Sequence, residues 1–146
     1  MQTKLDQISK MAKMDSKCRF NNLMHLLSKD NLKECFYSLR KNSAVGKDGI
    51  NWSEYEIRLD DRLDDLVTRM KNWSYRPQAV RRVYIPKNNG KLRPLGIPAI
   101  EDKIVQKALA RILTSIYEED FMDFSYGFRP GKSCHDALER VDYMIK

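Results

Sequence analysis

The segment that most constrains this chain is Arg81–Ile97, RRVYIPKNNGKLRPLGI. Two short alternating apolar runs, Val80–Ile85 and Leu92–Ile97, flank a turn at Lys87–Gly90, and this pattern predicts a β-hairpin. Every charged side chain from Lys71 to Ile100 is a Lys or an Arg. A basic hairpin of this kind suits a ligand that carries phosphates, either a nucleic acid or a nucleotide.

The register of the hairpin decides where its charges point. A two-residue turn at Asn89-Gly90 would place the apolar side chains of the two strands on opposite faces. A three-residue loop with Gly90 left-handed pairs Lys87 with Lys91 and gathers the apolar side chains on one face. Because register follows the buried face, we predict the three-residue loop. It also pairs Ile85 with Arg93 and Val83 with Leu95, and the shared face reads Arg81, Val83, Ile85, Lys87, Lys91, Arg93, Leu95 and Ile97. Charge alone does not distinguish this face from an ordinary solvated hairpin tip.

Composition indicates a globular protein with an anionic partner. The chain has 146 residues, of which 42% are hydrophobic and 32% charged, and its formal net charge is +7. No apolar run approaches the roughly 18 residues of a membrane span, so no membrane partner is expected. The cysteines, Cys18, Cys35 and Cys134, have no C-x-x-C spacing, which favours reduced thiols in the cytosol over disulfides or zinc ligands.

Helical spacing of apolar residues predicts helices on both sides of the hairpin, hence an α+β class that is mainly α. The expected helices are two in Met1–Ser28 with a break at Asp15 and Ser16, one from an Asp30 cap to Lys41, one from a Ser53-x-x-Glu56 capping box to about Lys71, one from Ile100 to Tyr117, and one from a Ser133-x-x-Asp136 cap. The predicted buried stripes are Leu5, Ile8 and Met11; Phe20, Leu23, Met24 and Leu27; Leu32, Cys35, Phe36 and Leu39; Tyr55, Leu59, Leu63, Leu66, Met70 and Trp73; the apolar positions of 100–117, including Leu109 and Leu113; and Ala137, Leu138, Val141, Met144 and Ile145.

No pattern of residues in the sequence indicates an active site. The acidic residues Asp60, Asp61, Asp64 and Asp65 alternate with arginines, so we expect a solvated charged face and no metal site there. The loop Asn42–Trp52, with Gly46 and Gly49 available for positive φ, has no phosphate-loop pattern and locally reads as a connector. Local chemistry alone therefore predicts a basic binding module.

Three stretches together carry a family resemblance: VGKDGI (Val45–Ile50), RRVYIPKNNGKLRPLGIPAIEDKIVQKAL (Arg81–Leu109) and YGFRPGKSCHDAL (Tyr126–Leu138). They resemble the N-terminal part of group II intron reverse transcriptases, also called maturases. The resemblance implies an N-terminal helical extension over 1–30. It further implies that 31–146 is the fingers subdomain of a right-hand polymerase, built around one antiparallel hairpin.

The resemblance also implies roles for individual residues. Lys87 and Arg93 match positions that contact the triphosphate of the incoming dNTP. The positions that match template or RNA contacts are Arg81, Arg82, Lys91, Gly46, Lys47, Gly49 and Arg129. Phe128 and Pro130 match the segment that borders the nascent base pair.

The family implies RNA-directed DNA synthesis with Mg²⁺, dNTPs, an RNA template and a DNA primer, together with help in intron splicing and mobility in the bacterial cytoplasm. The family's catalytic aspartates lie in the palm, which these residues do not include. We therefore expect a fragment without polymerase activity, catalytic residues or a metal site of its own. The alternatives are a non-catalytic RNA-binding module, a self-associating module such as a homodimer, and another lineage of bacterial reverse transcriptase. Within the family reading, Lys4, Lys10, Lys13, Lys17 and Arg19 could anchor intron RNA.

Overall fold

The computed structural model describes residues 2–15 and 17–146 and folds into two compact units. The hairpin unit is Phe20–Arg111, and the terminal unit is Met1–Arg19 together with Ile112–Lys146. Helices predominate, and a single two-stranded antiparallel sheet occurs among the described residues. The predicted α+β class, mainly α, is therefore confirmed.

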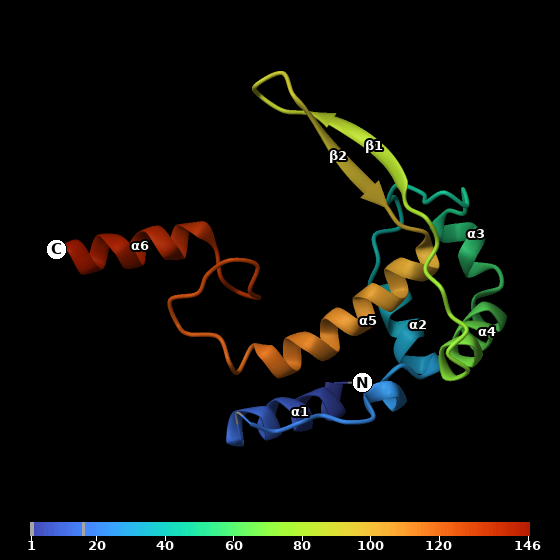
Figure 1. Ribbon diagram of the computed structural model, residues 1–146, viewed down its shortest axis with the longest axis horizontal. Helices are drawn as coiled ribbons and strands as arrows, with labels where there is room; N and C mark the ends of the chain where they lie inside the picture. The colour runs from blue at the N-terminus through green and yellow to red at the C-terminus, as the bar shows by residue number, and fades with distance from the viewer. Residues whose placement is uncertain (1, 16) are drawn as a thin grey trace. The chain divides into compact units, whose positions relative to one another are not determined.

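The hairpin unit places one β-hairpin beside a set of helices (Figure 1). Its elements are η1 (Leu23–Leu26), α2 (Lys29–Tyr37), α3 (Trp52–Glu56), α4 (Leu59–Lys71), β1 (Arg81–Pro86), β2 (Leu92–Ile97) and the larger part of α5 (Ile100–Tyr117). The hairpin extends away from the helices of this unit, so both of its faces are open over most of their length.

Phe36 lies at the centre of the core of the hairpin unit. Its ring stacks on Trp52 with the centroids 4.6 Å apart and lies 5.7 Å from the Tyr55 ring. Aliphatic side chains complete the core, namely Leu26, Leu32, Leu63, Leu66, Ile100 and Ile104. The prediction that α5 supplies core residues is right for Ile100 and Ile104, but two of its predicted core residues are exposed, Leu109 at 42% and Leu113 at 48%.

Two predicted helix boundaries in this unit are wrong. The N-cap of α2 is Ser28, whose hydroxyl accepts from the Asn31 amide at 3.4 Å, and not Asp30. The helix ends at Tyr37 and not at Lys41, because the Ser38 hydroxyl donates to the Cys35 carbonyl and competes with the helical pattern there.

The segment between α2 and the hairpin also departs from prediction. The capping box is formed by Asn51 and Glu54 and not by Ser53 and Glu56. The helix is interrupted after Glu56, so α3 and α4 are separate. Trp73, predicted to be buried, is 86% exposed because its left-handed φ of 57° turns the chain out of the helix.

The segment Phe20–Leu27 is not the predicted α-helix. Asn22 is left-handed at φ 57°, and only the 3₁₀ turn η1 follows it. Leu26 and Leu27 are nevertheless buried, so the segment contributes apolar side chains without a regular helix.

The acidic residues of α4 form the predicted solvated face. At the surface Asp61 pairs with Arg58 and Asp65 with Arg69, whereas Asp60 and Asp64 pair with lysines. Lys29 lies 2.6 Å from Asp64, and Lys33 lies 2.9 Å from Asp60. These lysines belong to α2, so the ion pairs also connect α2 with α4. The sequence did not predict this connection.

The terminal unit contains α1 (Gln2–Met14), the end of α5 and α6 (Cys134–Ile145). Leu5, Ile8 and Ala12 of α1 are buried, whereas Met11 is 52% exposed. The predicted break falls where α1 ends, although Ser16 lies outside the described residues.

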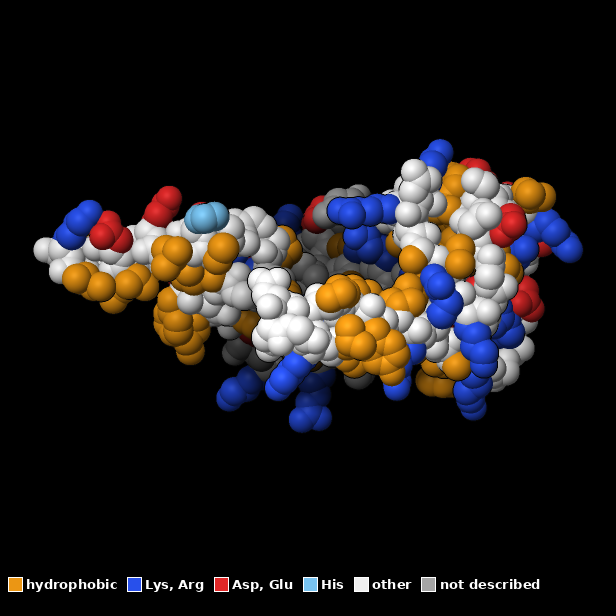
Figure 2. Space-filling model, turned by 90° about the horizontal axis from the view of Figure 1, so that it is seen from above, with side chains coloured by type: hydrophobic (Ala, Val, Ile, Leu, Met, Phe, Trp, Pro, Cys, Tyr) orange, Lys and Arg blue, Asp and Glu red, His pale blue; other side chains and the backbone are white. Residues whose placement is uncertain are grey.

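Helix α6 begins as predicted but is not buried as predicted. Ser133 and Asp136 form its capping box. No described side chain of α6 is buried, and Figure 2 shows hydrophobic side chains along one side of it, opposite charged ones. Leu138, Val141, Met144 and Ile145 are all more than half exposed because nothing among the described residues packs over them.

Candidate nucleic-acid interface

The hairpin has the predicted register and loop. Ile85 pairs with Arg93 and Val83 with Leu95. At the tip the Lys87 amide donates to the Lys91 carbonyl at 2.8 Å, and Gly90 is left-handed with φ 75°. The three-residue loop is thus confirmed, and glycine is favoured at position 90 because an L side chain is strained at this φ.

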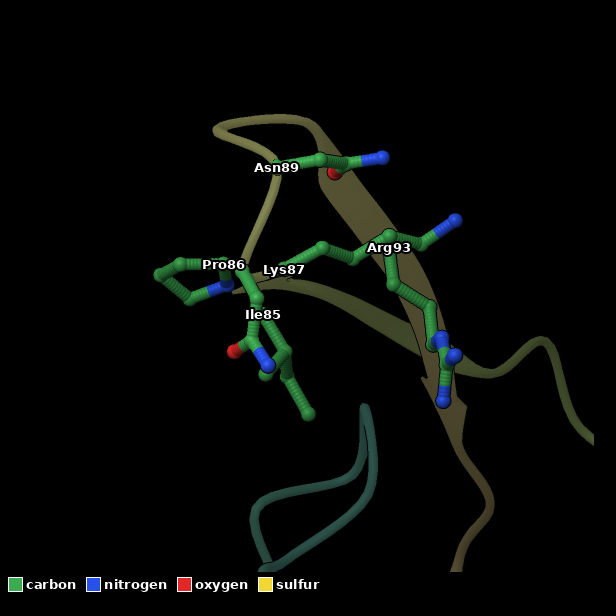
Figure 3. Close-up of a pocket in the computed structure, with 6 residues that line it drawn as sticks. Ile85, Pro86, Lys87, Asn89 and Arg93 are labelled. Atoms are coloured by element: carbon green, nitrogen blue, oxygen red, sulfur yellow. The ribbon is translucent and has the colours of Figure 1, made fainter.

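A pocket of about 440 Å³ lies beside this tip (Figure 3). It is lined by Ile85, Pro86, Lys87, Asn88, Asn89 and Arg93. Figure 3 shows the Lys87 and Arg93 side chains directed to the same side of the hairpin. The lining contains two cations, two amides and no carboxylate, a set that suits an anion such as a phosphate group.

The third predicted member of this cluster, Lys91, does not line the pocket. It lies opposite Lys87 across the tip, and its side chain is exposed. The structure therefore brings Lys87 and Arg93 together and leaves Lys91 at the edge of the same face.

The apolar base of this face is not buried as the register argument assumed. Ile85 is 45% and Leu95 44% exposed, Val83 is half-buried, and only Ile97 is buried. A two-stranded ribbon has no second layer of its own, so its apolar side chains need another element or a ligand to cover them.

Arg81 and Arg82 are neighbours in β1 and so point to opposite faces of the ribbon. Arg81 shares the face of Lys87 and Arg93, and its Nε donates to the Val45 carbonyl at 2.9 Å. Arg82 lies on the other face and is exposed. The two arginines predicted to contact the template therefore occupy different surroundings.

The loop Asn42–Trp52 lies against the base of the hairpin. Gly49 has the expected positive φ, 72°. Gly46 does not; it is buried, and a Cβ on it would lie 2.6 Å from Ala99 Cα, so close backbone approach requires glycine there. Lys47 stands exposed between the two glycines.

The remaining predicted residues belong to the terminal unit. Arg129 pairs with Glu118 at 2.7 Å and donates to the carbonyls of Met122 and Ser125, and its side chain is only 8% exposed. Phe128 is fully exposed and left-handed, with φ 60°, and Pro130 is also exposed. The Phe128 ring is therefore bare, and it projects from a backbone position that L residues seldom adopt.

Sequence reasoning missed the buried carboxylate of Asp102. It accepts from the Tyr75 hydroxyl at 2.5 Å and from the Gln78 amide at 3.0 Å, and so fixes the chain that enters β1. Burial, together with the hydrogen bond to Asp102, raises the pKa of Tyr75 above its usual range. No local pattern marks this contact, because the partners are 27 and 24 residues apart.

The described residues contain no group of three or more His, Cys, Asp or Glu that could hold a metal ion. Asp102 is occupied by Tyr75 and Gln78, and Asp60 and Asp64 by lysines. The carboxylates present therefore do not fit a catalytic magnesium site. None of the helices among the described residues has the length and apolar character that a membrane span requires.

Comparison with known proteins identifies relatives of this chain. Residues 85–146 match the family model described as reverse transcriptase (RNA-dependent DNA polymerase). The chain is 38% identical to the group II intron-encoded protein LtrA of Lactococcus lactis, over 94% of the chain and 23% of that protein. It is 47% identical to protein YkfC of Escherichia coli K12, over 68% of the chain and 26% of that protein.

A third relative is the uncharacterized 91 kDa protein in the cob intron of Schizosaccharomyces pombe, 32% identical over 94% of the chain and 18% of that protein. The chain thus spans about a quarter or less of the length of these relatives. The match includes the second strand and the tip that form the pocket, and most of the chain aligns with intron-encoded proteins. The chain belongs to the reverse transcriptases of group II introns, also called maturases.

Proposed function

We propose that this chain binds RNA and an incoming deoxynucleoside triphosphate within an RNA-directed DNA polymerase. The observation that carries the proposal is the pocket at the hairpin tip, where Lys87 and Arg93 meet without a carboxylate. Lys87 supplies a compact point charge, and the Arg93 guanidinium supplies paired N–H donors that match phosphate oxygens. The two together suit a triphosphate better than a single phosphate.

The template strand would run along the face and loop that flank this pocket. Arg81, Lys91 and Lys47 offer cations to its phosphates, with Arg82 on the opposite side of the ribbon. Gly46 and Gly49 would act by shaping the loop, since neither carries a side chain. These contacts position a strand without reading its sequence.

The terminal unit would supply the surface beside the nascent base pair. The exposed ring of Phe128 is suited to stacking on a base or ribose, and Pro130 follows it closely. Arg129 would act indirectly, because its contacts with Glu118, Met122 and Ser125 shape the loop that presents Phe128.

In the full polymerase, Mg²⁺ would supply Lewis-acid chemistry at the triphosphate. The full polymerase would also bind a DNA primer. No group of carboxylates among the described residues could hold the Mg²⁺ ion, so we assign the catalytic step to other parts of the polymerase and propose no polymerase activity for this chain alone. We also propose a bacterial cytoplasmic location for the protein; two of its relatives are from Escherichia coli and Lactococcus lactis.

The group II relatives also support a role in splicing and mobility through intron RNA. We assign anchoring of that RNA to the extension 1–30, where Lys4, Lys10, Lys13, Lys17 and Arg19 are exposed. The remaining residues, 31–146, would form the fingers subdomain.

The salt dependence of RNA binding tests the proposal. Single-stranded RNA should bind with a log–log salt slope of about −0.7 for each phosphate contact. Replacing Arg82 and Lys91 by alanine should make the slope shallower by about 1.4, which is two such contacts. The variant Lys71→Ala removes an exposed charge at the end of α4 and should leave the slope unchanged. A flat slope for the unchanged chain would exclude phosphate-driven binding.

A second candidate function rests on the exposed apolar side of α6. Leu138, Val141, Met144 and Ile145 form a stripe that a second copy of the chain could cover, giving a homodimer. Sedimentation equilibrium tests this: Leu138→Lys with Met144→Lys should yield monomer where the unchanged chain dimerises. A monomeric unchanged chain at high concentration would rule out the homodimer.

A further inference from the structure

The loop Asn42–Trp52 is tied to the base of the hairpin by side chains from two different elements. Arg81, the first residue of β1, donates through Nε to the Val45 carbonyl at 2.9 Å. Lys103, in the first turns of α5, donates through Nζ to the Ala44 carbonyl at 2.6 Å and to the Ser43 hydroxyl at 3.3 Å. Two cations therefore hold two successive carbonyls of one loop.

The backbone on the other side of the loop makes the arrangement tight. A Cβ on Gly46 would lie 2.6 Å from both Ala99 Cα and Ala99 N. Ala99 follows directly on Ile97 and Pro98, and Ile97 pairs with Arg81. The loop thus lies where the two strands of the hairpin reach the helices, between Arg81 of β1 and the residues Pro98 and Ala99 that follow β2. We call the contacts of Arg81, Lys103 and Gly46 the loop clamp.

The charges of the loop clamp are held by neutral partners. The hydrogen-bond acceptors of Arg81 Nε and Lys103 Nζ are carbonyls and a hydroxyl, and burial lowers the pKa of Lys103. Of the charged groups near Lys103, Asp48 raises its pKa and Arg81 lowers it. A hydrogen bond from a charged donor to a carbonyl is stronger than one between neutral groups. Each of these contacts therefore restrains the loop.

The clamp leaves the outer turn of the loop open. Lys47 is exposed, and the turn is closed by the Gly49 amide on the Gly46 carbonyl at 3.4 Å and by the Ile50 amide on Asp48 at 3.3 Å. Arg81 donates through Nε in the clamp, and its position in β1 places it on the face of Lys87 and Arg93.

We propose that Arg81 and Lys103 are positioning residues that fix the loop Asn42–Trp52 to the hairpin, so that loop and hairpin hold RNA as one rigid surface. Arg81 then acts on RNA largely through the loop that carries Lys47. This inference rests on the proposed RNA binding and adds how two separate segments are made to act together.

Hydrogen exchange of the loop amides without RNA tests the clamp itself. The amides of Gly49 and Ile50 should exchange about tenfold faster in Arg81→Ala and in Lys103→Met, since each loses a hydrogen bond from a charged group. Gly46→Ala breaks the clamp from the loop side and should have the same effect without removing a charge. Lys71→Ala should leave these amides unchanged. Unchanged exchange in Arg81→Ala and Lys103→Met would overturn the clamp.

RNA affinity distinguishes a positioning role from a direct contact. Lys47→Ala should weaken binding severalfold in the unchanged chain and much less in the Arg81→Ala background, because the loop is then no longer held. If Lys47→Ala reduced RNA affinity by the same factor in the unchanged chain and in the Arg81→Ala background, the proposal would be overturned. Arg81→Lys sharpens the test: recovery of RNA affinity without recovery of slow loop exchange would show that the charge acts on RNA directly.

The two levels of the inference fail separately. Absence of RNA binding by the unchanged chain would overturn the proposed function and the RNA part of this inference. Normal RNA binding with unchanged loop exchange in the clamp variants would overturn the clamp alone.

Discussion

Ile85 lies directly opposite Arg93 in the hairpin, and this pairing places Arg93 diagonally across from Lys87 on the same face. The pocket beside the tip exists because of that relationship. A register shifted by one residue would send Arg93 to the other face and separate the two cations.

Loss of either cation in the pocket should weaken triphosphate binding. Lys87→Ala and Arg93→Ala should each raise the Kd for a dNTP by about tenfold or more, since each removes a charge-assisted contact worth about 1.5–3 kcal/mol. Arg93→Lys should also weaken binding, because an ammonium cannot replace the paired donors. Titration calorimetry measures this, with Lys71→Ala as the matched control. If all four variants bind the dNTP with equal affinity, the dNTP does not bind in this pocket.

The left-handed glycine at the tip should matter for stability. Gly90→Ala should lower the free energy of unfolding by about 1 kcal/mol, because φ is 75° and an L side chain is strained there. Gly127→Ala is the control, since its φ is ordinary and no other atom lies within 4 Å of the added Cβ. Urea unfolding compares the two, and an equal cost would contradict the assigned loop conformation.

Replacing the buried Asp102 should lower the free energy of unfolding more than replacing its partner Tyr75. Tyr75→Phe should cost about 1 kcal/mol of unfolding free energy, which is one hydrogen bond. Asp102→Ala should cost about 2–3 kcal/mol, because it leaves both the Tyr75 hydroxyl and the Gln78 amide without their acceptor. In the double variant Tyr75→Phe should cost much less than it does alone. Additive costs would show that the two residues do not act together.

The cap of α6 should make that helix sensitive to acid. Hydrogen bonds from the Ser133 hydroxyl and amide lower the pKa of Asp136 below its usual value. Because the pKa is lowered, the ionised Asp136 side chain stabilises the helix fully at pH values above the ordinary aspartate pKa. This stabilisation is lost as the pH falls through the pKa of the folded state. NMR titration should show the Asp136 pKa rising in Ser133→Ala. An unchanged value would contradict the cap.

Neutralising the exposed cations of the extension should test its role with intron RNA. Changing Lys4, Lys10, Lys13, Lys17 and Arg19 to glutamine should lower affinity for intron RNA and leave dNTP binding at the hairpin unchanged. Filter binding at fixed salt measures the first effect. If affinity persists in this variant but disappears in Arg82→Ala with Lys91→Ala, the extension does not anchor RNA.

Periodicity and turn chemistry in the sequence determined the hairpin and α5. The glycine at position 90 specified the three-residue loop, and alternation of apolar residues specified which residues pair. The charge of the hairpin face followed directly from that register. These features depend on neighbours within about ten residues, so the sequence was sufficient.

Only the tertiary structure decided what the flanking residues do. Trp73 and the apolar side of α6 follow helical spacing, yet they are exposed, because periodicity marks an apolar face without saying what covers it. Gly46 was predicted for its backbone freedom, but it is needed because Ala99 approaches it. Asp102, Lys103 and Arg81 make contacts across 24 to 60 residues, and such contacts exist only once the chain has folded. The hairpin was therefore set by local sequence, whereas its attachment to the loop was set by long-range packing.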